Sequence, residues 1–277
     1  LYETAEENGS ENFPEILQQS TTVGYMDVPD SILVSDTIFE GDHPALTYTL
    51  RGLVRTKVSL ETAANNVHSG MGGGVVANPI NILTRALATC YSDDGRLTFP
   101  GAYAGVIEPQ GEELEELQRM AETVYDHDKL LSDLGARETY TSNRLEALKR
   151  LWLLPTFEIH NLAGIQGTKI PRSASYDVTI RLVGGQQPEQ VLDALRTHLQ
   201  RVHKDIKVEG QGTPAVRTAL DNPFMFKAIE ACRVGFGKEP VYVGCGGTIG
   251  ALPLLQNTFP NAPIILLAMS KASDGYH

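Results

Sequence analysis

The pattern of apolar and polar positions along the chain changes twice, near residues 46 and 210. Outside these limits lie two short apolar runs, "DSILVSDT" at 30–37 and "NAPIILLAM" at 261–269. Each predicts a buried strand, and the second is typical of a parallel sheet covered on both faces. Between the limits, three stretches alternate apolar and polar residues, which predicts antiparallel strands with one face in water. These stretches are 46–62, 156–164 and 174–185.

Four other stretches repeat apolar residues at helical spacing and carry helix start or stop signals. They are 78–90, 111–126, 187–204 and 222–236. The second has an acidic first turn, and the third opens with Pro188 and closes on basic residues, as the helix dipole favours. Strands and helices together predict a two-layer α+β module in the middle section.

Composition and charge narrow the class of partner. The 277 residues are 42% hydrophobic and 21% charged, which is typical of a globular chain with a sizeable core. The net charge of −11 argues against a general nucleic-acid or membrane-surface binder, since both need clustered Lys and Arg. Small molecules or peptides are therefore the expected partners.

The cysteines and the apolar runs bear on location. Cys90, Cys232 and Cys245 lie far apart with no CxxC spacing, so neither a disulfide framework nor a thiolate metal site is indicated. No apolar run approaches the ~20 residues that span a bilayer. We expect a soluble protein in a reducing, cytoplasmic compartment. Because the chain opens "LYETAEE" without Met, we also expect it to be a segment of a longer protein whose targeting signals lie elsewhere.

Each of the two apolar runs leads to a potential metal ligand. Asp36 follows the first run, and the second leads to His277. Ligands of open α/β sheets bind outside the carboxyl ends of the strands. Read alone, Asp36 is more typical of a turn cap than of a metal ligand, and a terminal His277 is by default mobile.

Several motifs, taken in order, carry a family resemblance. They are "EENGS", "VSDT", "LRGLVRTKVSLETAANNVHSGMGGGVVANP", "GTKIPRSASYDVTIRLV", "GGTIGAL" and the closing "SDGYH". The chain resembles the M20 family of metallopeptidases, most of all its carnosinase-type dipeptidases. The resemblance implies a zinc-hydrolase α/β catalytic domain interrupted by an α+β lid, which has a four-stranded antiparallel sheet and dimerises. Residues 1–45 and 211–277 would be parts of the catalytic domain, and 46–210 the lid.

The resemblance also implies a catalytic and metal-binding set. Glu6 would be the general base that deprotonates a metal-bound water, and the adjacent Glu7 a zinc ligand. Asp36 would bind the second zinc, and His277 the same zinc as Glu7. Two Zn²⁺ per active site are implied, with Mn²⁺ as an alternative. Without the context of the other motifs, the Glu6-Glu7 pair is typical of a solvated acidic turn.

A second implied set holds the substrate. His68 would reach from one subunit into the partner's active site and stabilise the oxyanion, a role whose alternative is an exposed turn histidine. Thr168 and Arg181 would hold the substrate carboxylate and backbone, for which the planar fork of Arg is suited. Gly247 and Thr248 would form a carboxylate-binding loop with exposed N–H groups and a hydroxyl.

The family pattern also has features that this chain lacks. An upstream HxD, a further Asp and the final helix of the catalytic domain lie outside it. A catalytic zinc normally needs three protein ligands, so we expect this segment alone to be inactive. Dipeptide hydrolysis is the expected activity of the longer chain. The alternatives are N-acyl amino acid deacylation by the same machinery, or a non-catalytic dimerisation or peptide-binding fragment.

Overall fold

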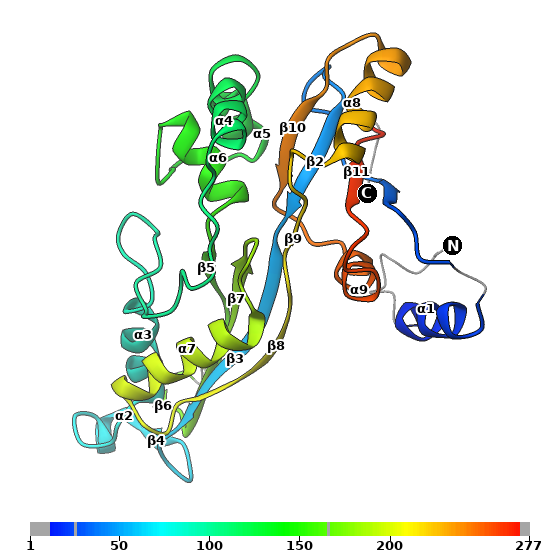
Figure 1. Ribbon diagram of the computed structural model, residues 1–277. Helices are drawn as coiled ribbons and strands as arrows, with labels where there is room; N and C mark the ends of the chain where they lie inside the picture. Colours follow the sequence, from blue (N-terminus) through cyan, green and yellow to red (C-terminus); the bar gives the residue numbers. More distant parts are fainter. Residues whose placement is uncertain (1–11, 25–26, 165–166, 272–277) are drawn as a thin grey trace. The chain divides into compact units, whose positions relative to one another are not determined.

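The chain folds into two compact units, each formed by segments that are distant in sequence. The computed structural model describes residues 12–24, 27–164 and 167–271. Unit 1 comprises Leu1–Arg51, Ile107–Leu153 and Ala215–His277, and unit 2 comprises Gly52–Val106 and Leu154–Pro214 (Figure 1). Within the predicted lid, 46–210, residues 46–51 and the segment Ile107–Leu153 make their contacts in unit 1.

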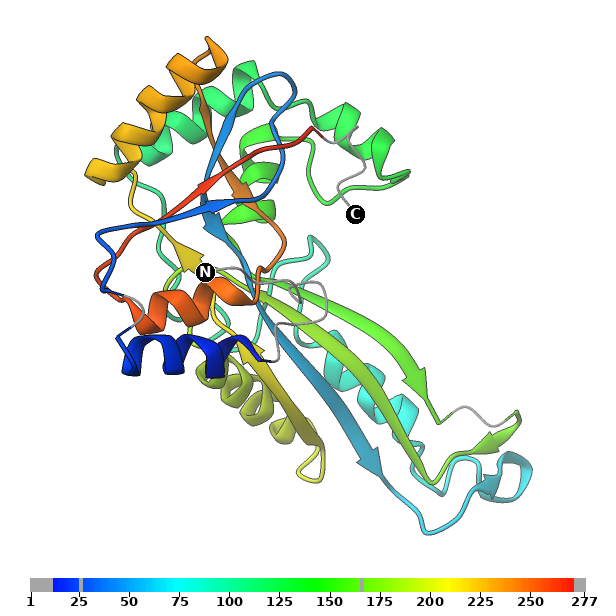
Figure 2. The same cartoon turned by 90° about the vertical axis from the view of Figure 1, so that its right-hand side faces the viewer.

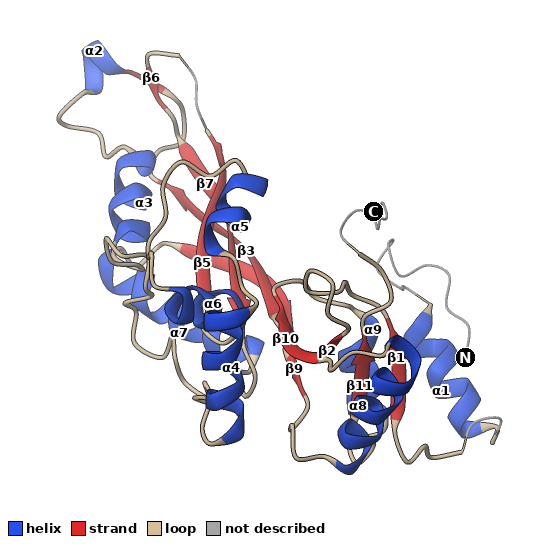
Figure 3. Cartoon of the chain, turned by 90° about the horizontal axis from the view of Figure 1, so that it is seen from above, coloured by secondary structure: helices blue, strands red, loops and turns tan. Residues whose placement is uncertain are grey.

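Unit 1 is built on a mixed sheet. Its main strand order is β1-β11-β2-β10, and β9 also pairs with β2 (Figure 3). β1 is parallel to β11 and β10 is parallel to β2, while β11 and β9 run antiparallel to β2. The strands are β1 (Ile32–Ser35), β2 (Ala45–Leu50), β9 (Val216–Arg217), β10 (Val241–Cys245) and β11 (Ile264–Leu267).

Two strand predictions for this sheet need correction. All six residues of β2 are buried, so 45–50 has no wet face. The Thr residues produced the misleading alternation: Thr47 and Thr49 are buried polar side chains in a central strand. β1 was expected to be buried, yet its side chains alternate and Leu33 is 67% exposed. The prediction of a buried strand was correct for β11.

Six helices of unit 1 lie in the described residues: α1 (Phe13–Thr22), α4 (Glu112–Thr123), α5 (His127–Asp133), α6 (Arg144–Trp152), α8 (Pro223–Phe236) and α9 (Ala251–Thr258). Asn143 and Asn222 cap α6 and α8, because each side chain accepts a bond from a first-turn N–H group. α4 and α6 pack on β10, while α8 packs on β11. Leu148 and Met225 are fully buried in this core.

Unit 2 contains the expected four-stranded antiparallel sheet. Its order is β5-β7-β3-β8, and Figure 2 shows its long strands side by side. The strands are β3 (Gly52–Glu61), β5 (Thr156–Ala163), β7 (Ser173–Leu182) and β8 (Lys207–Thr213). In β3, Val54 and Val58 are buried while Arg55 and Lys57 face water, as period-2 alternation predicts.

Two helices complete the core of unit 2. α3 (Pro79–Ala88) and α7 (Pro188–Val202) pack on β3, α3 also on β7 and α7 also on β8. Their Leu83 and Leu195 are fully buried in the same hydrophobic cluster as Ile180 of the sheet. A smaller element extends beyond this core: β4 (Val67–His68) pairs with β6 (Lys169–Ile170), and α2 (Ser69–Gly72) follows β4.

No helix in the described part of the chain combines the length and the apolar character that crossing a bilayer requires.

Candidate active site

The predicted site residues are distributed over both units. Glu6, Glu7 and His277 lie outside the described residues. Asp36, Gly247 and Thr248 belong to unit 1, whereas His68, Thr168 and Arg181 belong to unit 2.

Asp36 directly follows β1 and has a fixed orientation. Its backbone N–H donates to the carbonyl of Leu267 at 3.1 Å, and its Oδ1 accepts from the backbone N–H of Thr37 at 2.6 Å. Thr37 has a φ of 72°, a left-handed conformation that is rare for a β-branched residue. A carboxylate has about four acceptor positions, so the bond to Thr37 orients Asp36 and leaves capacity for a cation.

The two strands that lead to the predicted ligands are neighbours in the sheet. β1 and β11 run parallel, with Ser35 beside Leu267. Beyond the strands the alignment continues, because Ile38 forms a parallel bridge with Ser270. Their carboxyl ends therefore share one edge of the sheet, where an open α/β sheet binds ligands.

The described residues alone do not assemble a metal site. No group of three or more His, Cys, Asp or Glu side chains among them is placed to hold an ion. A carboxylate is a suitable ligand for Zn²⁺ or Mn²⁺, so Asp36 fits the predicted chemistry by its type. The other two predicted ligands, Glu7 and His277, are outside the described part.

The loop between β10 and α9 contains Gly247 and Thr248. The Gly247 N–H donates to the Sγ of Cys245 at 3.3 Å, and the Thr248 hydroxyl donates to the carbonyl of Arg51 at 2.5 Å. The hydroxyl proton expected to reach a substrate carboxylate is thus directed at the backbone. A thiol is a weak acceptor, so the Gly247 N–H is the donor more easily given to an anion.

His68 is exposed and its ring is oriented by α2. As the N-cap of this short helix, it accepts the Gly70 N–H at Nδ1, over 3.1 Å. An accepting Nδ1 in a neutral ring places the proton on Nε2. His68 therefore offers Nε2–H as a donor, the form that stabilisation of an oxyanion requires.

Two glycines make this turn feasible. A Cβ on Gly72 would lie 2.5 Å from Cγ1 of Val67, and Gly74 has a φ of 79°. Gly72 allows the close approach to Val67 because it has no Cβ. Gly74 adopts the left-handed conformation that glycine permits.

The small sheet brings two predicted residues together across about a hundred positions of sequence. β4 pairs with β6 in antiparallel register, with His68 opposite Lys169. Thr168 is exposed and immediately precedes Lys169. Spacing in the sequence gave no sign of this proximity, because it depends on a two-residue strand pair.

Arg181 lies near the opposite end of β7 from this small sheet. β6 ends at Ile170 and β7 begins at Ser173, whereas Arg181 is the penultimate residue of β7 and pairs with Leu53 and Thr156. Eight residues of strand at about 3.3 Å each separate Ser173 from Arg181 by roughly 26 Å. Thr168 and Arg181 were expected to act as a pair. Within unit 2 of a single chain they are therefore far apart.

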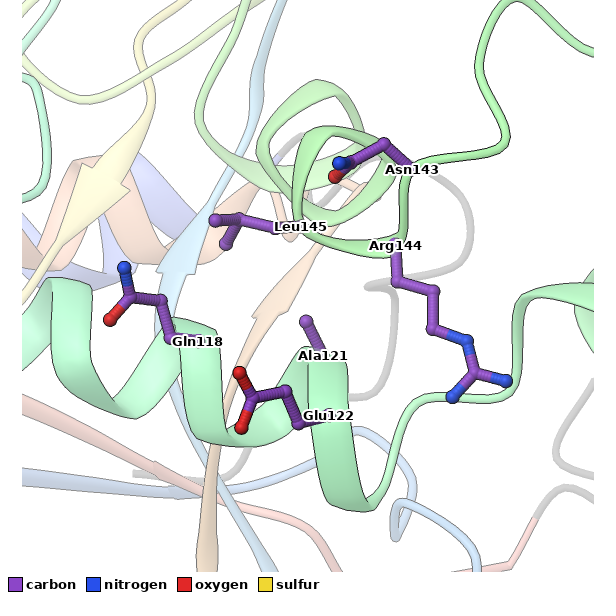
Figure 4. A pocket seen from close by; sticks show the side chains of 6 residues that line it. All are labelled: Gln118, Ala121, Glu122, Asn143, Arg144 and Leu145. Carbon is purple, nitrogen blue, oxygen red and sulfur yellow. The ribbon is translucent and has the colours of Figure 1, made fainter.

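A separate cavity of about 420 Å³ lies in unit 1. Figure 4 shows that α4 and the start of α6 provide its walls. Its lining residues are Gln118, Ala121, Glu122, Asn143, Arg144 and Leu145. None of them is a predicted site residue.

Arg51 belongs to the motif that begins at Leu50 but had no predicted role, and it contacts the loop of Gly247 and Thr248. An arginine after a strand has no distinctive spacing, and its partners are almost 200 residues away in the sequence. The contact of Arg51 with this loop therefore could not be inferred from sequence spacing.

Comparison with known proteins finds one family model that matches part of the chain and relatives that match its whole length. The family model described as a peptidase dimerisation domain of M20 matches residues 48–207. The Cys-Gly metallodipeptidase DUG1 of Saccharomyces cerevisiae is 27% identical over 294 residues, covering 100% of this chain and 59% of that protein.

Solved structures share the fold. The di-peptidase Dug1p from Saccharomyces cerevisiae gives a TM-score of 0.81 at 24% identity, covering 98% of this chain and 58% of that one. Human carnosine dipeptidase 1 gives a TM-score of 0.79 at 25% identity, covering 98% of this chain and 59% of that one. The chain thus spans less than two thirds of the length of these relatives. Since the family model covers more than half of the chain, the chain belongs to the M20 peptidase family.

Proposed function

We propose that the protein carrying this chain hydrolyses dipeptides or closely related amide bonds with a dinuclear zinc site. The observation that carries the proposal is similarity over the entire chain to a Cys-Gly metallodipeptidase. Family membership and the shared fold support the class of reaction. The choice of dipeptide substrates and of zinc is our inference.

In the proposed site, four residues bind the metal ions and activate the water. Glu7, Asp36 and His277 hold the metal ions, His277 on the same ion as Glu7 and Asp36 on the other. When bound, such ions polarise the scissile carbonyl and lower the pKa of a bound water to about 7. Glu6 accepts the proton of the attacking water as general base.

Substrate recognition is assigned to the hydrogen-bond donors that the sequence predicts. The guanidinium of Arg181 and the N–H groups around Gly247 and Thr248 are suited to a substrate carboxylate. His68 contributes its Nε2–H to the developing oxyanion, and the bond that its Nδ1 accepts from the Gly70 N–H supports that role. Thr168, next to the register partner of His68, acts at the same end of unit 2.

The length of β7 argues for an active site shared by two protomers. A dipeptide spans about 7 Å when extended. The separation of roughly 26 Å along β7 prevents His68 and Arg181 of one chain from contacting the same dipeptide. If all these residues act on one substrate, Arg181 comes from one protomer and His68 with Thr168 from its partner. Unit 2 then carries the dimer contact, and it lies almost wholly within residues 48–207, which match the model of a peptidase dimerisation domain.

Exposed apolar side chains near His68 support an intermolecular contact there. Met71 and Val75 are 88% and 89% exposed and follow His68 within seven residues. Large apolar side chains with such exposure are typical of surfaces that a partner covers. In the proposed dimer they pack on the second protomer and hold His68 in place.

Metal content and turnover test the proposal together. The full-length polypeptide is purified, its zinc measured by elemental analysis, and its hydrolysis of free-carboxylate dipeptides compared with that of N-acyl amino acids. We expect about two metal ions per chain and preferential dipeptide turnover that a chelator abolishes and Zn²⁺ or Mn²⁺ restores. Preference for N-acyl amino acids would change the substrate class. Metal-free protein without turnover would indicate a non-catalytic relative.

A further inference from the structure

Arg51 makes three hydrogen bonds to the loop Cys245–Thr248, two to backbone carbonyls and one with a side-chain hydroxyl. The Arg51 N–H donates to the Cys245 carbonyl at 3.1 Å, and the Arg51 carbonyl accepts the Thr248 hydroxyl at 2.5 Å. The guanidinium Nε donates to the Gly246 carbonyl at 3.2 Å. Both segments belong to unit 1, and Arg51 is its last residue before the chain enters unit 2.

The guanidinium also lies directly against Gly246. A Cβ at Gly246 would be 2.8 Å from Nη2 of Arg51, closer than real Cβ contacts. Gly246 does not have a positive φ, so its backbone conformation is open to other residues. A methyl group at this position would therefore require the guanidinium of Arg51 to move away.

Fixing the Gly246 carbonyl also fixes the next donor. The Gly246 carbonyl and the Gly247 N–H belong to the same planar peptide group and point in opposite directions. A loop that binds a carboxylate must present N–H groups and turn its carbonyl oxygens away from the anion. Two consecutive glycines do not hold such an orientation by themselves, because glycine is conformationally permissive.

We propose that Arg51 is a positioning residue for substrate binding, which orients the Gly246–Gly247 peptide so that the loop presents its N–H groups to the substrate carboxylate. The inference rests on the proposed function, in which this loop receives the carboxylate. Arg51 does not itself contact the substrate. It acts through the Gly246 carbonyl.

Two readouts test this role in the full-length polypeptide. Arg51→Met removes the guanidinium and keeps the alkyl stem and both backbone bonds. Loss of a hydrogen bond from a charged group corresponds to roughly a tenfold rise in KM for a dipeptide, with a smaller change in kcat. Alkylation of the Cys245 thiol, measured by mass spectrometry without substrate, is expected to become several-fold faster as the loop loosens. Arg51→Lys keeps the charge and one donor, so it should restore part of both effects.

Gly246→Ala tests the same contact from the other side. The new methyl group displaces the guanidinium, so this variant should reproduce Arg51→Met, and the double variant should be no worse than either single one. If Arg51→Met fails to fold, Gly246→Ala alone tests whether Arg51 orients the loop. The matched control is Arg137→Met, since Arg137 is an exposed arginine of unit 1 that is expected to leave both readouts unchanged.

The outcomes distinguish failure of the role of Arg51 from failure of the proposed function. A KM within about twofold of wild type in Arg51→Met and Gly246→Ala would overturn the role of Arg51. If the wild-type protein has no dipeptidase activity, the proposed function fails, and the Cys245 alkylation rate alone decides whether Arg51 orders the loop. An unchanged rate would then overturn the inference.

Discussion

Arg217 of β9 and Glu113 of α4 form an ion pair inside unit 1, and both side chains are only 15% exposed. The same guanidinium donates to the carbonyl of Ile107 at 2.8 Å. Arg217 therefore fixes both ends of the short segment that leads from the unit boundary at Ile107 into α4. Next to this pair, burial and then the charge of Glu113 raise the pKa of Tyr48 well above its usual range.

Breaking this ion pair should be costly. Arg217→Met leaves the Glu113 carboxylate largely buried without its counter-ion, which typically destabilises a protein by about 3–5 kcal/mol. Urea denaturation followed by circular dichroism measures the loss. Lys129→Met is the matched control, because Lys129 and Asp133 are 67% and 61% exposed and water and salt screen such a pair, so its loss should change stability much less. Equal effects of the two variants would contradict the importance of burial.

Gly244 is constrained by the indole of Trp152. A Cβ at Gly244 would lie 2.3 Å from Cγ of Trp152, at the end of α6. Gly244→Ala should therefore overpack unit 1 and cost about 1–3 kcal/mol. In contrast, Gly235 is exposed within α8 with open space around it, and Gly235→Ala should stabilise by up to about 1 kcal/mol. Thermal unfolding of both variants tests the contrast, and a neutral Gly244→Ala would refute the close approach.

The three cysteines should differ in reactivity. All are free thiols, and burial raises the pKa of Cys90 to about 12 and raises that of Cys232 as well. The thiolate is the reactive form, so both should resist alkylation near neutral pH. Cys245 is only partly buried and should be modified first. Peptide mapping after brief iodoacetamide treatment of native protein gives the order, and early labelling of Cys90 would disprove it.

Glu40, between β1 and β2, should make stability depend on pH. Burial raises the pKa of its carboxyl above the ordinary 4.5, and the nearby charge of His43 only partly offsets this. The folded state then holds the proton more tightly than the unfolded chain, so this contribution to stability falls as the pH rises from 4.5 towards the raised pKa.

Glu40→Gln removes that ionisation. Relative to wild type, the variant should gain stability as the pH rises through this window and keep the gain above it. Urea unfolding of both proteins from about pH 4 to pH 8 measures the difference. A difference that is constant with pH, or that shrinks as the pH rises, would show that burial does not control this carboxyl.

Mixed dimers can test the shared active site. His68→Ala and Arg181→Ala should each be nearly inactive as homodimers. In a mixed dimer, one site combines an intact Arg181 with the partner's intact His68. Random exchange of subunits should therefore restore up to about a quarter of wild-type activity. Mixing His68→Ala with Thr168→Ala is the control, because both changes affect the same end of unit 2 and no site becomes complete. Activity in the control mixture, or none in the first, would rule out the arrangement.

Local pattern was sufficient for much of the fold. The helices α3, α4, α7 and α8 agree closely with their predicted ranges, because their apolar spacing and end signals lie within a few turns. The alternation in β3 and β7 predicted the antiparallel sheet of unit 2. The order of the motifs indicated the family.

Only the tertiary structure decided which segments belong together. Three features depend on pairing or packing between segments that are distant in sequence. They are the burial of β2 on both faces, the packing of Ile107–Leu153 in unit 1, and the register of His68 with Lys169. The same is true of Arg51 with the loop of Gly246. Hydrophobic periodicity shows that a face is buried, but not which partner buries it. That choice is made by packing and hydrogen bonding across the whole chain, which no short window of the sequence contains.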